Sequence, residues 1–477
     1  MLFNSFAFLL FFPIVCIVYF IIPSLKYRNL FLLAASYYFY MNWQPIYALL
    51  LLTSTGITYL ASLGIDRFSD KKKKKNCLIA SLALNLSILF FYKYYGFAAE
   101  NVTALFSWLG IQIHVPDFQI LLPVGISFYI FQALGYSIDV YRGDTRVEKN
   151  FFTYALFVSF FPQLVAGPIE RSTNLLRQFY QKHQFDGDVA IEGVKIMLWG
   201  YFMKLVLADR CAMYVDMVYN HLNDHEGMST AIATVLFSFQ LYGDFAGYTF
   251  TAIGAARIMG FHLMDNFRRP YLFSTSVQDY WKRNHISLTS WFMDYVYYPL
   301  TERSNSINWW CFSIFLTFLI SGFWHGAAWT FIIWGSIHGV LLVMEMRTNK
   351  RKKKWEKKYH LSQREWYVWL QRIGIFLVLC LTLVFFRANS LSDAFKALQL
   401  IFTPSDFNMQ RGLTFILYSF LAFILLFIKE YLEEYKIVFS WQKKYKEICD
   451  DCWMIVLLLC ICWMGVFDGG QFIYFQF

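Results

Sequence analysis

One histidine in an apolar run is the residue best suited to acid–base chemistry. His325 stands in the run Ser321-Gly-Phe-Trp-His-Gly-Ala-Ala-Trp329, between glycines 322 and 326. An ionisable group inside an apolar segment is costly, so it marks a functional site by default. Histidine exchanges a proton near neutral pH, as activation of a hydroxyl for acyl transfer requires. A helix-packing motif around a hydrogen-bonded histidine is an equally weighted alternative.

A second histidine follows in a similar pattern, Gly335-Ser-Ile-His338-Gly339. If one helix ran through both motifs, its 13-residue offset would separate the histidines by roughly 20 Å of rise and about 220° of rotation. They would then belong to different sites. We therefore predict a packing role for His338.

Two further ionisable groups are candidates. The segment 277–300 is predicted to be an amphipathic interfacial helix, with His285 on its apolar side four residues after Trp281. A core residue is the alternative for His285. Asp244 lies between Gly243 and Gly247. It is expected to orient a histidine or a polar substrate, or to act as a hydrogen-bonded brace.

The composition indicates where these groups lie. Of 477 residues, 58% are hydrophobic and 52 are Phe, 32 Tyr and 16 Trp. Charged residues make up 16%, against about 25% in soluble proteins. So many aromatic side chains must face lipid or one another. These proportions exclude a soluble enzyme, a disordered chain and a disulfide-rich secreted protein.

The net charge of +10 is concentrated in two runs, Lys71–Lys75 and Arg347–Lys358. Each run adjoins a long apolar stretch, as cytoplasmic loops of membrane proteins do. We therefore predict membrane lipid as the surroundings, a cytoplasmic side marked by both runs, and no binding of nucleic acid. Cys449 and Cys452 form a lone pair with no second pair, and nothing else indicates a metal site.

The apolar segments predict an all-α polytopic membrane protein forming a single transmembrane domain over residues 1–477. There are roughly 11 to 13 membrane segments. Several contain Pro, Gly or charge, which membranes tolerate only where protein or a water-filled cavity covers the backbone. We therefore expect re-entrant or broken helices around an internal cavity, with breaks at Pro123-Val-Gly125, Ala166-Gly-Pro168 and Gly243-Asp244.

The assembled motifs resemble the membrane-bound O-acyltransferase family, and within it the branch of bacterial alginate O-acetyltransferase membrane subunits. The resemblance covers almost the whole chain. It rests on Met1–Phe6, Leu122–Tyr129 with Phe131-Gln132, Phe161–Ile169 with Arg171, Asp244–Tyr248, Tyr280–Leu288, Gly322–Ala327 and Phe472–Phe477.

The resemblance implies helices arranged around a central tunnel. It implies catalytic roles for His325 and His285. Within the matching motifs, the candidate substrate-binding residues are Asp244, Trp324, Asn284, Gln163 and Arg171. Two positions depart from the family pattern. Asn284 stands where a tryptophan is usual, and Thr249-Phe250 follow Tyr248 where Ser-Asp is common.

The resemblance also implies the reaction. Cytoplasmic acetyl-CoA would be the acyl donor, with no bound cofactor, and an exported polysaccharide such as alginate or another cell-wall polymer would be acetylated. His325 would be the general base. The chain would lie in the bacterial cytoplasmic (inner) membrane, and an extracytoplasmic esterase-like protein would be its partner. Transfer of D-alanine from a carrier protein to teichoic acid is the alternative chemistry. A secondary transporter is the alternative from a different class, although no repeated helix bundle is present in the sequence.

Overall fold

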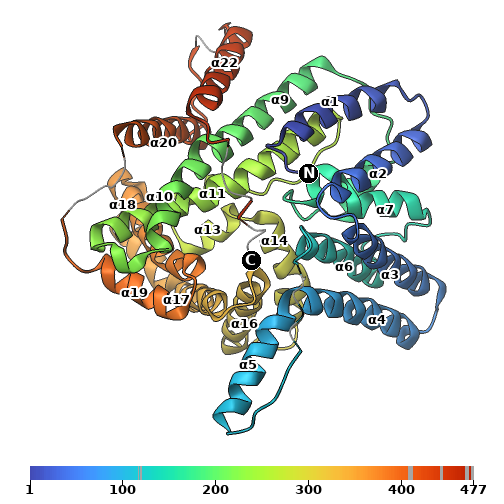
Figure 1. Cartoon of the computed structure of the whole chain (residues 1–477), viewed down its shortest axis with the longest axis horizontal. Coiled ribbons are helices and arrows are strands. Elements are labelled where there is room, and N and C mark those ends of the chain that lie inside the picture. The colour runs from blue at the N-terminus through green and yellow to red at the C-terminus, as the bar shows by residue number, and fades with distance from the viewer. Residues whose placement is uncertain (117, 119–120, 407–411, 441–443, 468–471, 474–477) are drawn as a thin grey trace. The chain divides into compact units, whose positions relative to one another are not determined.

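The computed structural model describes residues 1–116, 118, 121–406, 412–440, 444–467 and 472–473, and every regular element in these ranges is helical (Figure 1). Within them, 6 helical stretches are long and apolar enough to cross a membrane, and Phe6–Ile21 is apolar but shorter. The prediction of an all-α polytopic membrane protein is confirmed. The other expected segments are helices that are shorter, broken or more polar. The six stretches are Tyr47–Arg67, Lys71–Trp108, Ile307–His325, Trp329–Lys358, Glu365–Arg387 and Leu413–Glu434.

The chain forms two compact units. The N-terminal unit comprises Met1–Met197 and Thr251–Met264, and the C-terminal unit comprises Leu198–Phe250 and Asp265–Phe477. The elements of the N-terminal unit are α1 (Phe6–Ile21), α2 (Leu25–Met41), α3 (Tyr47–Arg67), α4 (Lys71–Leu89), η1 (Phe90–Tyr94), α5 (Tyr95–Trp108), α6 (Ile126–Arg142), α7 (Phe151–Ser159), α8 (Phe161–Leu164), η2 (Ser172–Leu176) and most of α9 (Gly187–Tyr201).

Hydroxyl groups join the helices of the N-terminal unit. Ser54 of α3 donates to Oδ1 of Asn85 in α4 at 2.5 Å. The hydroxyl of Tyr154 in α7 donates to Oγ1 of Thr58 in α3 at 2.7 Å. All four side chains are buried. Lipid chains are as apolar as the helix surfaces, so the hydrophobic effect does not drive helices together within a membrane. Hydrogen bonds and close packing of this kind stabilise the bundle instead.

The C-terminal unit contains Asp244 and the two histidines of the predicted site, His285 and His325. Its elements are η3 (Phe202–Ala208), α10 (Asp209–Tyr219), η4 (Leu222–Asp224), most of α11 (Gly227–Ile258), α12 (Pro270–Phe273), α13 (Val277–Arg283), α14 (Ile286–Phe292), η5 (Met293–Tyr297), α15 (Tyr298–Thr301), α16 (Ile307–His325), α17 (Trp329–Lys358), η6 (Leu361–Gln363), α18 (Glu365–Arg387), α19 (Leu391–Ile401), α20 (Leu413–Glu434) and α22 (Lys446–Met464).

The long apolar block that holds His325 folds as a helical hairpin. Helix α16 ends at His325, and α17 begins at Trp329 and packs against it. A Cβ atom on Gly322 would lie 2.9 Å from the Cα of Gly335, so only glycines allow the two backbones to come this close. The premise of a single helix through both histidine motifs was therefore wrong, because the chain reverses between them.

Of the three expected breaks, two are observed. Gly125 adopts a positive φ of 72° directly before α6, and residues 165–171 run as irregular backbone after α8. The break at Gly243-Asp244 was wrong, because α11 continues through it. Instead, Gly243 and Gly247 let α11 approach the π-helical segment η3, since added Cβ atoms would lie 2.8 Å from the Met203 carbonyl and 2.7 Å from that of Gly200.

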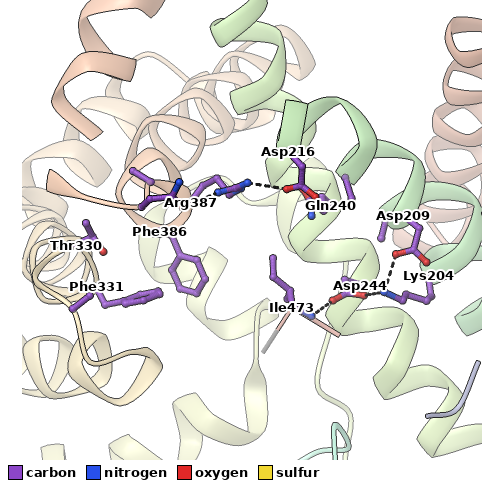
Figure 2. A pocket seen from close by; sticks show the side chains of 15 residues that line it. Lys204, Asp209, Asp216, Gln240, Asp244, Thr330, Phe331, Phe386, Arg387 and Ile473 are labelled. Atoms are coloured by element: carbon purple, nitrogen blue, oxygen red, sulfur yellow. Dashed lines mark hydrogen bonds and ion pairs between the residues drawn. The ribbon is translucent and has the colours of Figure 1, made fainter. Parts of the chain in front are cut away.

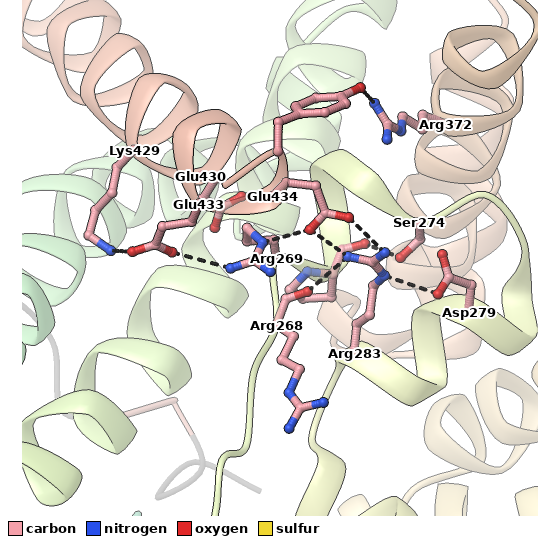
Figure 3. A network of polar contacts seen from close by, with 12 residues as sticks. Arg268, Arg269, Ser274, Asp279, Arg283, Arg372, Lys429, Glu430, Glu433 and Glu434 are labelled. Carbon is pink, nitrogen blue, oxygen red and sulfur yellow. Dashed lines mark hydrogen bonds and ion pairs between the residues drawn. The ribbon is translucent and has the colours of Figure 1, made fainter. Parts of the chain in front are cut away.

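The segment 277–300 is not one helix. Helix α13 ends at Arg283 and α14 begins at Ile286, so His285 lies at a break. A charged network fixes the end of α13 (Figure 3). Arg283 donates to both carboxylate oxygens of Glu434 at 2.9 and 3.0 Å and to Asp279 at 3.0 Å. Arg269 donates to the same Glu434 at 2.7 Å. Bidentate pairing of this kind strongly restricts the orientation of the guanidinium group. Arg283, two residues before His285, is therefore held in place.

Candidate active site

His325 lies among aromatic rings contributed by three helices. Its side chain is 3% exposed at the last position of α16. Its ring centroid lies 5.0 Å from that of Trp324, 5.1 Å from Trp334 of α17 and 5.4 Å from Phe386 of α18, all edge to face. This packing excludes bulk water, and a nucleophile activated there meets few competing water molecules.

His285 lies beside His325. The ring centroids are 6.5 Å apart, and Trp324 lies 6.0 Å from His285. Directly hydrogen-bonded imidazoles would have centroids about 5 Å apart, so the two rings are neighbours without a direct hydrogen bond between them. The predicted pair of histidines is thus brought together with Trp324.

The backbone of His285 adopts the left-handed conformation, with φ 46° and ψ 51°. A non-glycine residue persists there only when its surroundings fix it, and such residues cluster at functional sites. Asn266 supplies that constraint, because its backbone carbonyl oxygen accepts a hydrogen bond from the backbone N–H of Ile286 at 2.9 Å. His285 is 2% exposed, and this burial lowers the pKa of its imidazole to about 3.

Asn266 also sets which nitrogen of His285 carries the proton. Its Oδ1 accepts the backbone N–H of Ser287 at 3.1 Å and the hydroxyl of Ser287 at 2.9 Å. The backbone N–H of Ser287 can only donate a hydrogen bond, so the Asn266 atom that it contacts is the amide oxygen and not the amide nitrogen. Nδ1 of His285, 3.2 Å from the same oxygen, must therefore donate too. The neutral ring consequently keeps its lone pair on Nε2. Sequence analysis missed Asn266, since no helical or apolar spacing marks it.

Asp244 does not contact a histidine through any bond observed in the described residues. It forms an ion pair with Lys204 at 2.5 Å, and Lys204 also binds Asp209 at 2.8 Å (Figure 2). The other oxygen of Asp244 accepts the backbone N–H of Ile473 at 2.6 Å. Lys204 and both carboxylates are buried, so the charges compensate one another. The bracing role predicted as one alternative for Asp244 is observed.

A polar cavity of about 290 Å³ opens over this triad. It is lined by Lys204, Asp209, Asp216, Gln240, Asp244, Thr330, Phe331, Phe386, Arg387 and Ile473, among others (Figure 2). Phe386 is shared between the cavity wall and the surroundings of His325. The cavity therefore ends one aromatic ring away from His325.

A second, more apolar cavity of about 530 Å³ lies along α13 to α15, α16 and α17. Its wall includes Trp281, whose ring is 5.8 Å from Trp334, and Lys282. Thr330 and Phe331 of α17 line the polar cavity, whereas Leu342, Glu345 and Met346 line the apolar one. From Phe331 to Met346 a helix rises about 22 Å. The apolar cavity therefore lies toward the basic run Arg347–Lys358, and the polar cavity toward the opposite end of α17.

His338 is held differently. The indole N–H of Trp281 donates to its Nδ1 at 3.3 Å, so Nε2 carries the proton and donates to Thr382 at 3.2 Å. Both ring nitrogens are thus used by fixed partners. His338 is separated from His325 by Trp334, whose ring lies 4.8 Å from the first and 5.1 Å from the second.

The remaining predicted residues have contacts of their own. The backbone of Asn284 ends α13, its N–H donating to Tyr280 at 2.8 Å. Gln163 and Arg171 belong to the N-terminal unit. There Gln163 is buried and donates to the Phe157 carbonyl at 3.1 Å, and Arg171 is half-buried before η2. Of the Phe472–Phe477 motif, residues 474–477 lie outside the described residues.

Comparison with known proteins identifies the family. The profile of MBOAT, the membrane-bound O-acyltransferase family, matches residues 145–388. The chain is 34% identical over 414 residues to a probable alginate O-acetylase of Azotobacter vinelandii, covering 86% of this chain and 79% of that protein. It is 33% identical over 431 residues to a peptidoglycan O-acetyltransferase of Helicobacter pylori, covering 84% and 79%. A teichoic acid D-alanyltransferase of Bacillus subtilis is 28% identical over 280 residues, covering 56% and 69%.

Proposed function

Since this chain belongs to the membrane-bound O-acyltransferase family, we propose that it transfers an acetyl group from cytoplasmic acetyl-CoA to a hydroxyl of an exported polysaccharide or cell-wall polymer. The proposed location is the bacterial cytoplasmic membrane. An extracytoplasmic esterase-like partner would complete delivery to the polymer.

The observation that carries this proposal is the pair of buried imidazoles with ring centroids 6.5 Å apart, in a unit that also holds a polar cavity beside Phe386 and an apolar cavity beside Trp281. The apolar cavity lies toward the basic run of α17, which the positive-inside rule assigns to the cytoplasm. The cationic segment there favours an anionic donor such as acetyl-CoA. The polar cavity lies toward the other end of α17 and suits a hydroxylated acceptor. Donor and acceptor would thus approach His325 from opposite sides.

In the proposed reaction, His325 accepts the proton of the acceptor hydroxyl while the hydroxyl oxygen attacks the thioester carbonyl. The tetrahedral intermediate collapses, the carbon–sulfur bond breaks, and the thiolate of CoA takes the proton from the imidazolium. His285 orients the acceptor, because its Nε2 lone pair can accept a hydrogen bond from a neighbouring hydroxyl.

The negative charge of the intermediate needs a donor. The indole N–H of Trp334 is buried and has no hydrogen-bond partner among the described residues, and its ring lies 5.1 Å from that of His325. A preorganised donor in a dry site is the arrangement that stabilises an oxyanion. Trp334 is therefore the proposed oxyanion donor.

The test is mass spectrometry of acetyl esters on surface polysaccharide and peptidoglycan. Cells lacking the gene would be complemented with wild type, His325→Ala or the control His360→Asn. His360 is an exposed histidine with φ 51°, a conformation asparagine tolerates. The proposal predicts esters with wild type and His360→Asn only. Equal ester content with His325→Ala at equal protein level would refute it.

D-alanyl transfer is the second candidate, favoured by the match to the Bacillus subtilis D-alanyltransferase. The same samples distinguish it. Loss of D-alanine esters with acetyl esters intact would replace acetyl-CoA by an aminoacyl carrier protein as donor.

A further inference from the structure

We propose that Glu434, the last residue of α20, is a positioning residue for His285. Its carboxylate holds together the two chain segments that carry His285 and Asn266, and acetyl transfer depends on their alignment. The inference rests on the proposed role of His285 in acetyl transfer. It names the residue through which a membrane-spanning helix acts on that histidine.

The two segments, 266–269 and 283–286, are joined directly beside the histidine. The backbone N–H of Arg268 donates to the carbonyl of Arg283 at 2.8 Å. The backbone N–H of Ile286 donates to the carbonyl of Asn266 at 2.9 Å. His285 lies between these two hydrogen bonds. The distance of 3.2 Å from its Nδ1 to Oδ1 of Asn266 therefore depends on how the two segments are aligned.

Each segment contains a residue in the left-handed backbone conformation. The φ angle is 52° at Arg269 and 46° at His285, and only two other non-glycine residues in the described ranges have a positive φ. This conformation is unfavourable for a residue with a side chain, and it persists only where the surroundings fix it. Both segments therefore need a constraint from outside.

Glu434 constrains both segments (Figure 3). It accepts hydrogen bonds from Nη1 and Nη2 of Arg283 at 3.0 and 2.9 Å and from Nε of Arg269 at 2.7 Å. Isolated ion pairs on a protein surface stabilise little, but bidentate arginine–carboxylate pairs within a network are an exception. The Glu434 side chain is 14% exposed, so solvent screens these bonds only in part. One carboxylate thus holds an arginine of each segment.

Helix α20 has further attachments near its end. The hydroxyl of Tyr435 accepts a hydrogen bond from Arg372 of α18 at 2.9 Å, and Glu430 accepts one from Tyr242 of α11. Both contacts remain when the Glu434 carboxylate is removed. We therefore expect that removal to release the two segments without detaching the helix.

The experiment compares Glu434→Gln with the matched control Glu433→Gln. Glu433 binds Arg269 at 3.3 Å and Lys429. Its replacement removes the same charge one residue away but keeps both bonds between Glu434 and Arg283. Cells that lack the gene are complemented with each variant. Mass spectrometry measures the rate at which labelled acetate enters esters of their surface polymer, per amount of protein.

We expect Glu434→Gln to lower this rate about tenfold, because a misplacement of about 1 Å at a reacting centre can cost up to roughly 10²-fold. Glu433→Gln should stay within about twofold of the wild type. A double-mutant cycle separates positioning from a merely structural role. In a His285→Ala background, Glu434→Gln should change the remaining rate by less than about twofold, whereas a residue that only supports the fold would lower it again.

Arg283→Lys provides the same test if Glu434→Gln accumulates poorly. Lysine keeps the positive charge but cannot pair with a carboxylate through two parallel N–H groups. Arg283→Lys should therefore also lower the rate about tenfold, and again only where His285 is present.

A wild-type rate in Glu434→Gln, together with a loss in His285→Ala, would overturn the inference and leave the proposed function standing. Equal losses in both backgrounds would overturn it as well, as would a wild-type rate in His285→Ala. Absence of acetyl esters in cells with the wild-type protein would instead contradict the proposed function itself.

Discussion

His285 and His338 are both buried neutral histidines of the C-terminal unit, yet their nitrogens are used differently. Both nitrogens of His338 bind fixed side chains, those of Trp281 and Thr382. Asn266 accepts the hydrogen bond of Nδ1 of His285, so the lone pair of that neutral ring is on Nε2. The comparison teaches that burial alone does not distinguish the two histidines. The identity of the groups that hold the ring does.

The largest effect on acetyl transfer is expected at His325. Its ring lies 6.5 Å from that of His285 and is separated from His338 by Trp334. His325→Ala should lower acetyl transfer by about 10³-fold at unchanged protein level, because general base catalysis contributes about 10²–10⁴-fold. The rate of ester formation by purified protein measures this. A loss under tenfold would place the base elsewhere.

Trp334 lies between His325 and His338, so its indole sharpens the comparison. Trp334→Phe keeps an aromatic ring but removes the N–H, and it should lower kcat about 10²-fold with KM for acetyl-CoA unchanged. Trp366→Phe, an exposed tryptophan of α18, is the matched control. If kcat stays within threefold of wild type, Trp334 is a packing residue only.

Asn266→Asp tests the region of His285 by pH. A carboxylate beside Nδ1 favours the imidazolium and raises the pKa of His285 from about 3 by about 1–3 units. The neutral ring then exists only above the raised pKa, so activity should be lost as the pH falls through it. The acidic limb of the plot of kcat against pH should therefore move to higher pH.

Asn305→Asp introduces the same charge at an exposed position and should leave that limb in place. An unchanged limb in Asn266→Asp, with reduced stability alone, would show that Asn266 merely supports the fold.

The smallest effect on activity is expected at His338. His338→Leu leaves the buried indole N–H of Trp281 without its acceptor, which should cost about 1–3 kcal/mol of stability. The transfer rate per folded molecule should stay within about twofold. Thermal unfolding in detergent and ester formation measure the two quantities. A large loss of rate without loss of stability would make His338 catalytic.

The helical class and the candidate His325 could be predicted because their signals are local, whereas His285 was assigned to the site through the family resemblance. Apolar length predicts spanning helices, and an ionisable group in an apolar run is visible from its neighbours. Prediction from the sequence failed where a residue distant in the chain determines the local backbone conformation. Asn266 holds His285 in a left-handed conformation across 19 residues of sequence, so the predicted continuous helix is broken there.

The same reason explains the glycines. Gly243 and Gly247 look like helix breakers in sequence, but they serve the close approach of α11 to η3. Lys204, the counterion of Asp244, was invisible for the same reason, since its partner stands 40 residues away in another helix.

The most direct test of the central claim uses purified protein in sealed vesicles. Acetyl-CoA is supplied on the side that carries Arg347–Lys358. The exported polysaccharide of the source cells is sealed on the other side together with the esterase-like partner. His325 as the general base predicts acetyl esters on the sealed polysaccharide with wild type and none with His325→Ala. Esters formed at the wild-type rate by His325→Ala, or only on the side of acetyl-CoA, would contradict the account.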